Sequence, residues 1–249
     1  MDNLDGRIVE ASAIDRQKAD ELFELMDKYY GRMSRETFLR DLYEKDWVLL
    51  LTKQGSEKIE GFTTILRMEA TLDGKLYRAL YSGDTIIDAE SRGQTEIMRV
   101  WLNFALEMAE TMKGENLYWF LISKGYRTYK LLPLHAREYY PRYDKETPLE
   151  YKRLIDAFAT QRFGSAYDPA TGVIKPRGER DFLKSSTDDI TQHRLNDPHI
   201  KFFIEKNPNF HDGDELACIT VVSRDNLARF ARRIVAPPAG GADNSRRGA

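Results

Sequence analysis

The amino-acid sequence predicts an α/β (α+β) fold with a mixed, mostly antiparallel central sheet flanked by helices. Three observations carry this prediction. Short apolar runs of strand length alternate with longer amphipathic runs of helical period, and an Asp-Gly pair at residues 73–74 joins two of the short runs as a hairpin. The amphipathic run 95–112 also separates two strand-length runs, which is the order of a parallel strand–helix–strand unit.

The N-terminal part is expected to contain one strand followed by two helices. Residues 7–13 are short and partly β-branched, as is typical of a strand. Asp15 can cap a first helix that ends near Gly31, and Ser34 begins a second helical run. Two helices therefore precede the main part of the sheet.

The central part is expected to form three antiparallel strands, then a helix and a parallel strand. The meander strands are predicted at residues 47–51, 59–68 and 76–88, with turns at 54–56 and 73–74. Helix 95–112 has apolar side chains at three- and four-residue steps and leads to a strand at 117–122.

The C-terminal half is expected to extend this domain. Its predicted elements are a helix at 126–137 interrupted by Pro133, a helix with a capping box at Thr147-Pro148-Leu149-Glu150, a short helix at 200–205, a strand at 216–222 and a closing helix at 226–234. The last strand can pair with strand 117–122. We therefore expect a domain at residues 1–145, an extension at 146–236 packed on it, and a disordered tail at 237–249.

Composition restricts the possible partners and the compartment. The formal net charge of −2 over 249 residues gives no global electrostatic case for nucleic acid or an anionic membrane. The single cysteine, Cys218, excludes an internal disulfide and lies in an apolar run, which favours a buried thiol. The N-terminus lacks the pattern of a signal peptide, and no apolar run reaches the ~20 residues of a membrane helix. A cytoplasmic protein is expected.

One junction of the sequence predicts an anion site. The strand that ends near Asp88 passes through Arg92-Gly93 directly into the helix that begins at Thr95. The first backbone N–H groups of a helix have no partner within the helix, and here they face the region beyond the strand's carboxyl end. Phosphate groups are the preferred ligands of such a junction.

The order of elements resembles the GNAT superfamily of acyl-CoA-dependent N-acyltransferases, over residues 7–142. In that family the fourth strand and the following turn hold the pantetheine arm and the pyrophosphate of the acyl carrier, through a pattern Q/R-x-x-G-x-G/A. The matching residues here begin at Arg92, and Thr95 and Ile97 replace the two glycines of the pattern. Carbon atoms then stand where glycine lets a pyrophosphate approach, so a carrier-protein-bound acyl group with one phosphate fits this turn better.

The resemblance implies a site for the acyl donor, a tyrosine that acts as a general acid and a carboxylate that acts as a general base. The donor is acyl-CoA or acyl-phosphopantetheine, bound as a substrate, with no metal. The implied donor-binding residues are Ile86, Ile87, Asp88, Arg92, Gly93, Gln94, Thr95, Lys124 and Arg127. A tyrosine after the fifth strand protonates the leaving thiolate in the family, and Tyr126 and Tyr129 lie in that segment. Asp84 is the carboxylate expected to take the proton of the amine.

Each of these assignments has a structural alternative. Tyr126 and Tyr129 are two of thirteen tyrosines and can simply pack in the core. Asp84 and Asp88 share one sheet face if their strand is regular. The basic residues between Lys124 and Arg142 can bind a 3′-phosphate or an acidic carrier protein, or form a solvated helix face.

The sequence therefore predicts an acyltransferase that moves an acyl group from a thioester to an amine of a small molecule or protein. The alternative is a non-catalytic GNAT-like binding or regulatory module with a degenerate cofactor turn. The expected acceptor is a small-molecule or peptide amine, and an acidic acyl carrier protein is a further candidate partner. Nucleic acid, membrane and metal are not expected, because no matching motif or ligand spacing is present.

Overall fold

A computed structural model describes residues 4–31, 34–91, 95–112, 114–175, 182–183 and 192–237. Its N-terminal elements are β1 (Leu4–Glu10), α1 (Arg16–Tyr29), β2 (Tyr30–Gly31), α2 (Arg35–Tyr43), β3 (Trp47–Lys53), β4 (Ile59–Leu72), β5 (Lys75–Ile87), α3 (Glu96–Glu110) and β6 (Leu117–Ser123). The following elements are α4 (Tyr126–Tyr129), α5 (Leu131–His135), β7 (Tyr139–Tyr140), α6 (Leu149–Phe163), β8 (Tyr167–Asp168), β9 (Val173–Ile174), β10 (Phe182–Leu183), α7 (Pro198–Lys206), β11 (Glu215–Val222) and α8 (Ala231–Ile234).

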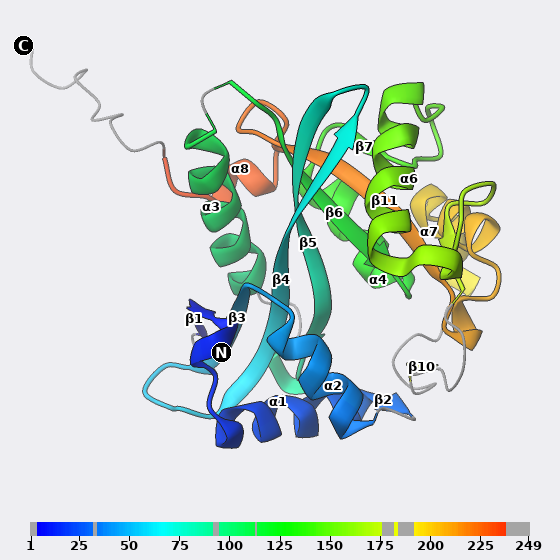
Figure 1. Cartoon of the computed structure of the whole chain (residues 1–249). Coiled ribbons are helices and arrows are strands. Elements are labelled where there is room, and N and C mark those ends of the chain that lie inside the picture. The colour runs from blue at the N-terminus through cyan, green and yellow to red at the C-terminus, as the bar shows by residue number, and fades with distance from the viewer. Residues whose placement is uncertain are drawn as a thin grey trace, which may run out of the picture.

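One mixed sheet organises the described part of the chain (Figure 1). Its strand order is β1-β3-β4-β5-β6-β11-β9-β8, and β7 pairs with β11 at the side of this path. The β5–β6 pair is parallel and is joined by α3, whereas the other pairs are antiparallel. The predicted fold class is thus confirmed, including the pairing of the C-terminal strand β11 with β6.

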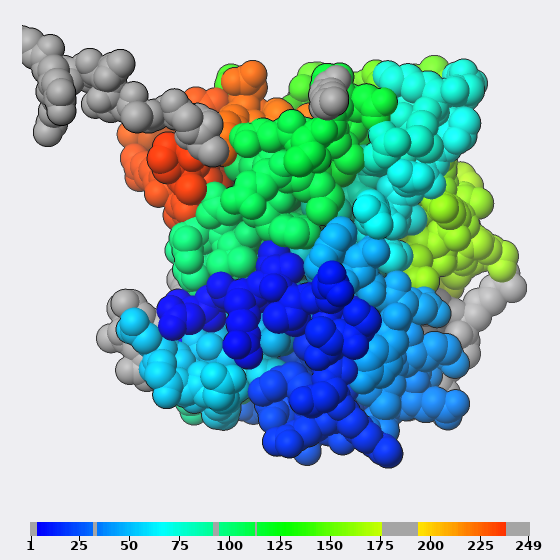
Figure 2. Space-filling view, turned by 60° about the vertical axis from the view of Figure 1, so that its left-hand side comes forward, coloured from blue at the N-terminus to red at the C-terminus, as the bar shows by residue number. Residues whose placement is uncertain are grey.

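Helices cover both faces of the sheet. On one face α3 and α7 pack over a core that includes Trp101, Trp119 and Phe203. On the other face α1 and α2 cover one end, and α6 covers the other end around Phe158. Figure 2 shows α3, in green, above the dark blue N-terminal residues on one side of the molecule. Most of the stabilisation of such a fold comes from this apolar burial.

The local signals for helix starts and turns act largely as predicted. Asp15 accepts a hydrogen bond from the N–H of Lys18, and Ser34 accepts one from the N–H of Thr37, so both caps are confirmed. Asp73 has a φ of 52° and is followed by Gly74 at 76°, as a tight hairpin turn between β4 and β5 requires.

Two helix predictions at the C-terminal side are wrong in detail. The capping box at residues 147–150 is absent, because α6 begins after Pro148 and has no side-chain cap bond. The closing helix is only Ala231–Ile234, since Leu227 instead forms a β-bridge with Ala136. Phe230, within the predicted helix, precedes the helix that forms and is 39% exposed. The predicted tail lies, apart from Pro237, outside the described residues.

Candidate functional site

The neighbouring strands β5 and β6 separate before either of them ends. Their last pair is Ser82 with Leu121. Beyond it β5 stays on β4 as far as Ile87, while β6 stays on β11 as far as Ser123. One backbone edge of residues 83–87 therefore has no partner in β6. Unpaired strand edges of this kind can bond an extended ligand.

A β-bulge marks the point of separation. Thr63 pairs with Thr85 and Ile65 with Ser82, so β5 holds one more residue than β4 across this interval. A Cβ atom on Gly83 would lie 2.5 Å from Thr64 Oγ1 and 2.9 Å from Lys45 Cε. Glycine is therefore required here by close packing on the side of β5 that faces Lys45.

A cavity of about 120 Å³ lies where the strands separate. Its apolar lining comes mainly from α3, β6 and α5, through Ile97, Met98, Trp101, Trp119, Leu121 and Leu131. Its polar lining consists of Tyr30, Thr63, Ser82, Asp84, Thr85, Lys124, Thr128 and Glu215. We call this cavity, with the open backbone edge of residues 83–87, the β5–β6 cleft. An apolar space with a few convergent polar groups is typical of a small-molecule site.

The charged groups of the cleft are largely shielded from water. Lys124 Nζ lies 3.7 Å from Glu215 Oε1, and the two side chains are 12% and 14% exposed. The same ammonium lies 5.3 Å from the centre of the Tyr30 ring. Electrostatic interactions are stronger in such a site than in water.

Two tryptophans with different hydrogen bonding form the inner lining. Trp119 donates from Nε1 to Ser82 Oγ at 2.9 Å, and its ring lies 4.3 Å from that of Trp101. Trp101 is 2% exposed, yet its Nε1 has no hydrogen-bond partner among the described residues. A buried donor without a partner is costly, and a ligand in the cleft could supply the missing acceptor.

The structure separates the two aspartates that a regular strand would place together. Asp84 lines the cleft. Asp88 lies beyond the end of β5 and accepts a hydrogen bond from Lys28 Nζ of α1 at 2.6 Å, beside a different hollow. The bulge between Ser82 and Thr85 breaks the alternation of side chains, so the expectation of a shared face is wrong.

The tyrosines predicted for the acid role point elsewhere. Tyr129 is fully buried, donates to the carbonyl of Pro141 at 3.0 Å and packs on Phe202 and Phe203. Its burial raises the pKa of the phenol well above the ordinary value. Tyr126 is 4% exposed, and its hydroxyl contacts the guanidinium of Arg194. The residue that this segment contributes to the cleft is Thr128.

The predicted donor-binding residues are only partly brought together. Ile87 and Lys124 line the cleft, whereas Ile86 is buried in the core beneath α1 and α2. Asp88 is bound to α1, as described above. Arg127 is exposed and lies over the ring of Tyr126, at 5.7 Å from its centre.

The turn before α3 is described only at its end. Arg92, Gly93 and Gln94 lie outside the described residues. Thr95 is the N-cap residue of α3 and makes no side-chain cap bond. The carboxylate of Glu96 in the first turn receives two hydrogen bonds from Arg99, at 2.5 and 2.7 Å, which reduces its repulsion of an anion.

Sequence reasoning did not identify Tyr30, Thr128 and Glu215 as residues of this site. Tyr30 follows α1, and Glu215 begins β11, about 185 residues later. Only the pairing of β11 with β6 brings Glu215 next to Lys124. The sequence predicts that pairing. The position of Glu215, directly before the predicted strand 216–222, was therefore the signal that could have placed it near Lys124.

Comparisons with known proteins concern the fold. No family model and no curated protein matches the sequence. A GCN5-related N-acetyltransferase from Kribbella flavida is 18% identical over 51% of this chain and 32% of its own, with a TM-score of 0.38. A GNAT family N-acetyltransferase from Escherichia coli, solved with CoA, is 13% identical over 50% of this chain and 64% of its own, with a TM-score of 0.35.

A third solved structure matches more of the chain. A probable N-acyltransferase from Enterococcus faecalis is 12% identical over 87% of this chain and 65% of its own, with a TM-score of 0.43. The matched region is less than two thirds of the length of each of these three proteins. The present chain has the parallel β5–β6 pair joined by α3 that its sequence predicts.

Proposed function

We propose that the protein transfers an acyl group from a thioester to an amine in the β5–β6 cleft. The observation that carries the proposal is the separation of β5 and β6 after Ser82 and Leu121, with a cavity at that point. A pantetheine arm is extended and contains two amide groups. Such an arm can lie along residues 83–87 and bond their backbone edge as an added strand would.

The cleft supplies groups for the chemistry of aminolysis. The amine nitrogen attacks the thioester carbonyl carbon and forms an amide C–N bond, while the C–S bond breaks and its electron pair leaves on sulfur. The Asp84 carboxylate takes the proton that the nitrogen loses, directly or through water. Backbone N–H groups of the open β5 edge stabilise the negative charge that develops on the carbonyl oxygen.

The proton for the thiolate has to come from a group that faces the cleft. Tyr30 and Tyr81 are the tyrosines among the described residues that line it. Burial raises the pKa of Tyr81 well above the ordinary value, so its phenol is a poor acid. We assign the acid role to Tyr30. Tyr126 and Tyr129, implied by the family resemblance, then hold the helical segment by packing and hydrogen bonds.

The acceptor is proposed to be a small-molecule or peptide amine. Two carboxylates, Asp84 and Glu215, line the cleft against one ammonium, that of Lys124. This excess of negative charge attracts the cationic form of an amine before it is deprotonated. The donor is acyl-CoA or an acyl group on a carrier protein.

The proposal is tested by titrating the purified chain with acetyl-CoA, longer acyl-CoAs and an acyl carrier protein, and by mass spectrometry of a panel of amines incubated with each. Amide formation with any donor, lost in Asp84→Asn and retained in Asp88→Asn, is the expected result. Binding of a donor without product from any amine would favour the non-catalytic alternative. No binding of any donor would refute the proposal.

A further inference from the structure

A second hollow lies on the other side of α5 from the β5–β6 cleft. Leu131 at the start of α5 lines the cleft, whereas Pro133 and Ala136 line this hollow, whose volume is about 530 Å³. The two cavities share no lining residue. The hollow is therefore independent of the proposed acyl transfer.

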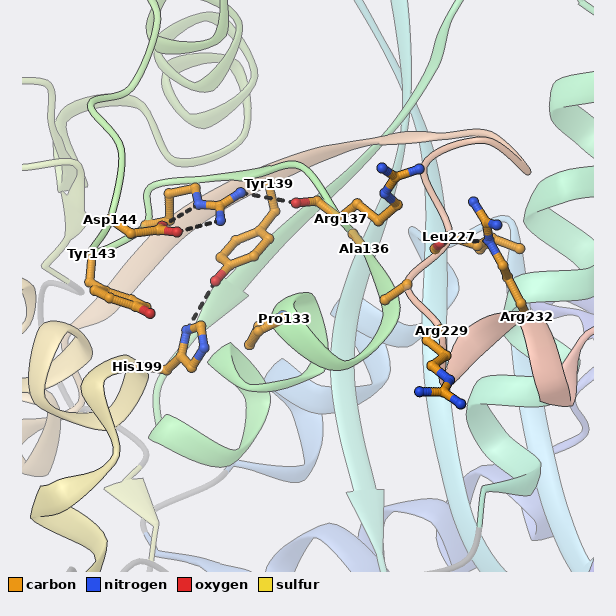
Figure 3. A pocket seen from close by; sticks show the side chains of 12 residues that line it. Pro133, Ala136, Arg137, Tyr139, Tyr143, Asp144, His199, Leu227, Arg229 and Arg232 are labelled. Carbon is orange, nitrogen blue, oxygen red and sulfur yellow. Dashed lines mark hydrogen bonds and ion pairs between the residues drawn. The ribbon is translucent and has the colours of Figure 1, made fainter.

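Four arginines line the hollow, together with one acidic residue, Asp144. The arginines are Arg137, Arg142, Arg229 and Arg232. We call it the arginine hollow. In Figure 3 Arg137, Arg229 and Arg232 lie at one side, while Tyr143, Asp144 and His199 lie at the other, and the side chain of Arg229 points away from those of Arg137 and Arg232. The formal net charge of the whole chain is −2, so this concentration of positive charge is local.

The acidic residue is already neutralised. Arg142 donates to the two carboxylate oxygens of Asp144, at 2.5 and 2.7 Å, and to the carbonyl of Arg137 at 2.9 Å. The pKa of Asp144 is lowered chiefly by this bonding, so the carboxylate stays ionised and paired with Arg142. It does not compensate the other three guanidinium groups.

None of the other three guanidinium groups pairs with a carboxylate among the described residues. Those of Arg137 and Arg232 bond carbonyl oxygens. Arg137 and Arg232 both donate to the carbonyl of Asp225, at 3.5 and 3.3 Å, and Arg232 donates to that of Leu227 at 3.0 Å. Arg229 is exposed and has no ion-pair or hydrogen-bond partner in the described part of the chain. The guanidinium groups of Arg137 and Arg232 thus lie next to each other at the Asp225 carbonyl, and such a pair of like charges is unfavourable unless an anion compensates it.

The rest of the lining is apolar and aromatic. Pro133, Ala136 and Leu227 line the hollow, and the ring of Tyr143, 47% exposed, packs edge-on against His199. His199 accepts or donates a hydrogen bond with Tyr139, and burial lowers its pKa, which favours a neutral imidazole. The lining thus combines a positive side with an uncharged aromatic side.

We propose that the arginine hollow binds a phosphorylated small molecule, with its phosphate on Arg137 and Arg232 and its apolar part against Leu227. Guanidinium groups bind phosphate oxygens in pairs, which gives geometry as well as charge. The volume of about 530 Å³ lies in the usual range for a small ligand.

The test uses the full chain and three probes: inorganic phosphate, inorganic pyrophosphate and adenosine monophosphate. Binding is followed by calorimetry and by NMR of the arginine Nε–Hε resonances. We expect shifts at Arg137 and Arg232 and tighter binding of adenosine monophosphate than of inorganic phosphate. Arg137→Ala should weaken pyrophosphate binding about tenfold, since it removes one charged contact.

The matched control is Arg153→Ala. Arg153 is a surface arginine that pairs with Asp73 and does not line the hollow, so its loss should leave binding unchanged. The side chain of Arg137 makes one long internal hydrogen bond, 3.5 Å to the carbonyl of Asp225, so its variant should keep the unfolding temperature. The proposal is overturned if no probe binds or if both variants lose affinity equally.

Discussion

Two segments of β5 differ in their backbone pairing with the neighbouring strands. Residues 78–82 lie between β4 and β6 and are paired on both edges, whereas residues 83–87 have no partner in β6 and are paired with β4 only at 85–87. We call them the paired segment and the open segment. The paired segment is closed to ligands because its backbone groups are already bonded. The open segment leaves one edge for a substrate, and the same strand therefore provides both stability and a site.

The side chains of the two segments follow the same division. Leu80 in the paired segment is fully buried, and Arg78 is held by Glu69 and Glu115. The open segment instead presents Asp84 and Thr85 to a cavity. Substitutions in the paired segment should therefore affect folding, and those in the open segment should affect chemistry.

The largest expected effect is on catalysis at the open segment. Asp84→Asn keeps the size of the side chain but removes the proton acceptor, so amide formation should fall by about 10²- to 10⁴-fold. The free energy of unfolding should change little. Rate measurements together with thermal unfolding check both parts. A variant that transfers at the rate of the parent chain would show that Asp84 is not the base.

The second effect concerns the boundary between the segments. Gly83→Ala places a methyl group against Thr64 and Lys45, and overpacking of this kind lowers the free energy of unfolding by about 1–3 kcal/mol. Thr64 Oγ1 is the nearest atom and is buried without a partner among the described residues. Adding Thr64→Ala should therefore recover part of the loss in a double-mutant cycle. Strict additivity of the two changes would contradict the packing argument.

The third effect distinguishes the two stacked tryptophans. Trp119→Phe removes the hydrogen bond to Ser82 at the end of the paired segment, whereas Trp101→Phe removes no internal hydrogen bond. Both changes delete the same ring atoms from a buried site. Trp119→Phe should therefore cost about 0.5–1.5 kcal/mol more in urea unfolding than Trp101→Phe. Equal costs would show that the Ser82 bond contributes nothing.

The smallest effect lies just beyond the open segment, at Asp88. Burial opposes its ionisation, but hydrogen bonds from Lys28 and the N–H of Glu90 outweigh this, so the pKa of Asp88 lies below its ordinary value. A lowered pKa in the folded state means that the stabilisation is present above the unfolded pKa of about 3.9 and is lost as pH falls through the folded pKa.

The measurement for Asp88 compares the parent chain with Asp88→Asn by unfolding at pH 7 and in acid. Lys28 is half exposed, so the variant should be only slightly less stable at pH 7. The difference should disappear in acid. A difference that grows as pH falls would contradict the assignment, and a loss of acyl transfer would place Asp88 in the site.

Most of the fold could be predicted from the sequence because its signals are local. The caps at Asp15 and Ser34, the hairpin at Asp73 and the apolar periodicity of α3 each act within a few residues. The parallel β5–β6 pair follows from the crossover rule. The helix after residue 226 was predicted too long. The backbone of Leu227 pairs with Ala136 in a β-bridge, and sequence spacing does not reveal this contact.

The site was less predictable because it depends on a β-bulge and on contacts between residues that are far apart in the sequence. The position of the cleft follows from element order, and Asp84, Ile87 and Lys124 lie in it. The bulge that separates Asp84 from Asp88 has no clear sequence signal. Tyr126 and Tyr129 are in the expected segment, but their orientation depends on packing against Arg194 and Phe203, about 70 residues later.

A crystal structure of the chain with bound CoA tests most directly whether the pantetheine arm binds in the β5–β6 cleft. We expect pantetheine electron density between residues 83–87 of β5 and residues 121–124 at the end of β6, with its amide groups bonded to the open edge of β5. Ordered CoA at any other place on the molecule would contradict it. So would a crystal soaked at saturating CoA in which β5 and β6 are bonded to each other along residues 83–87.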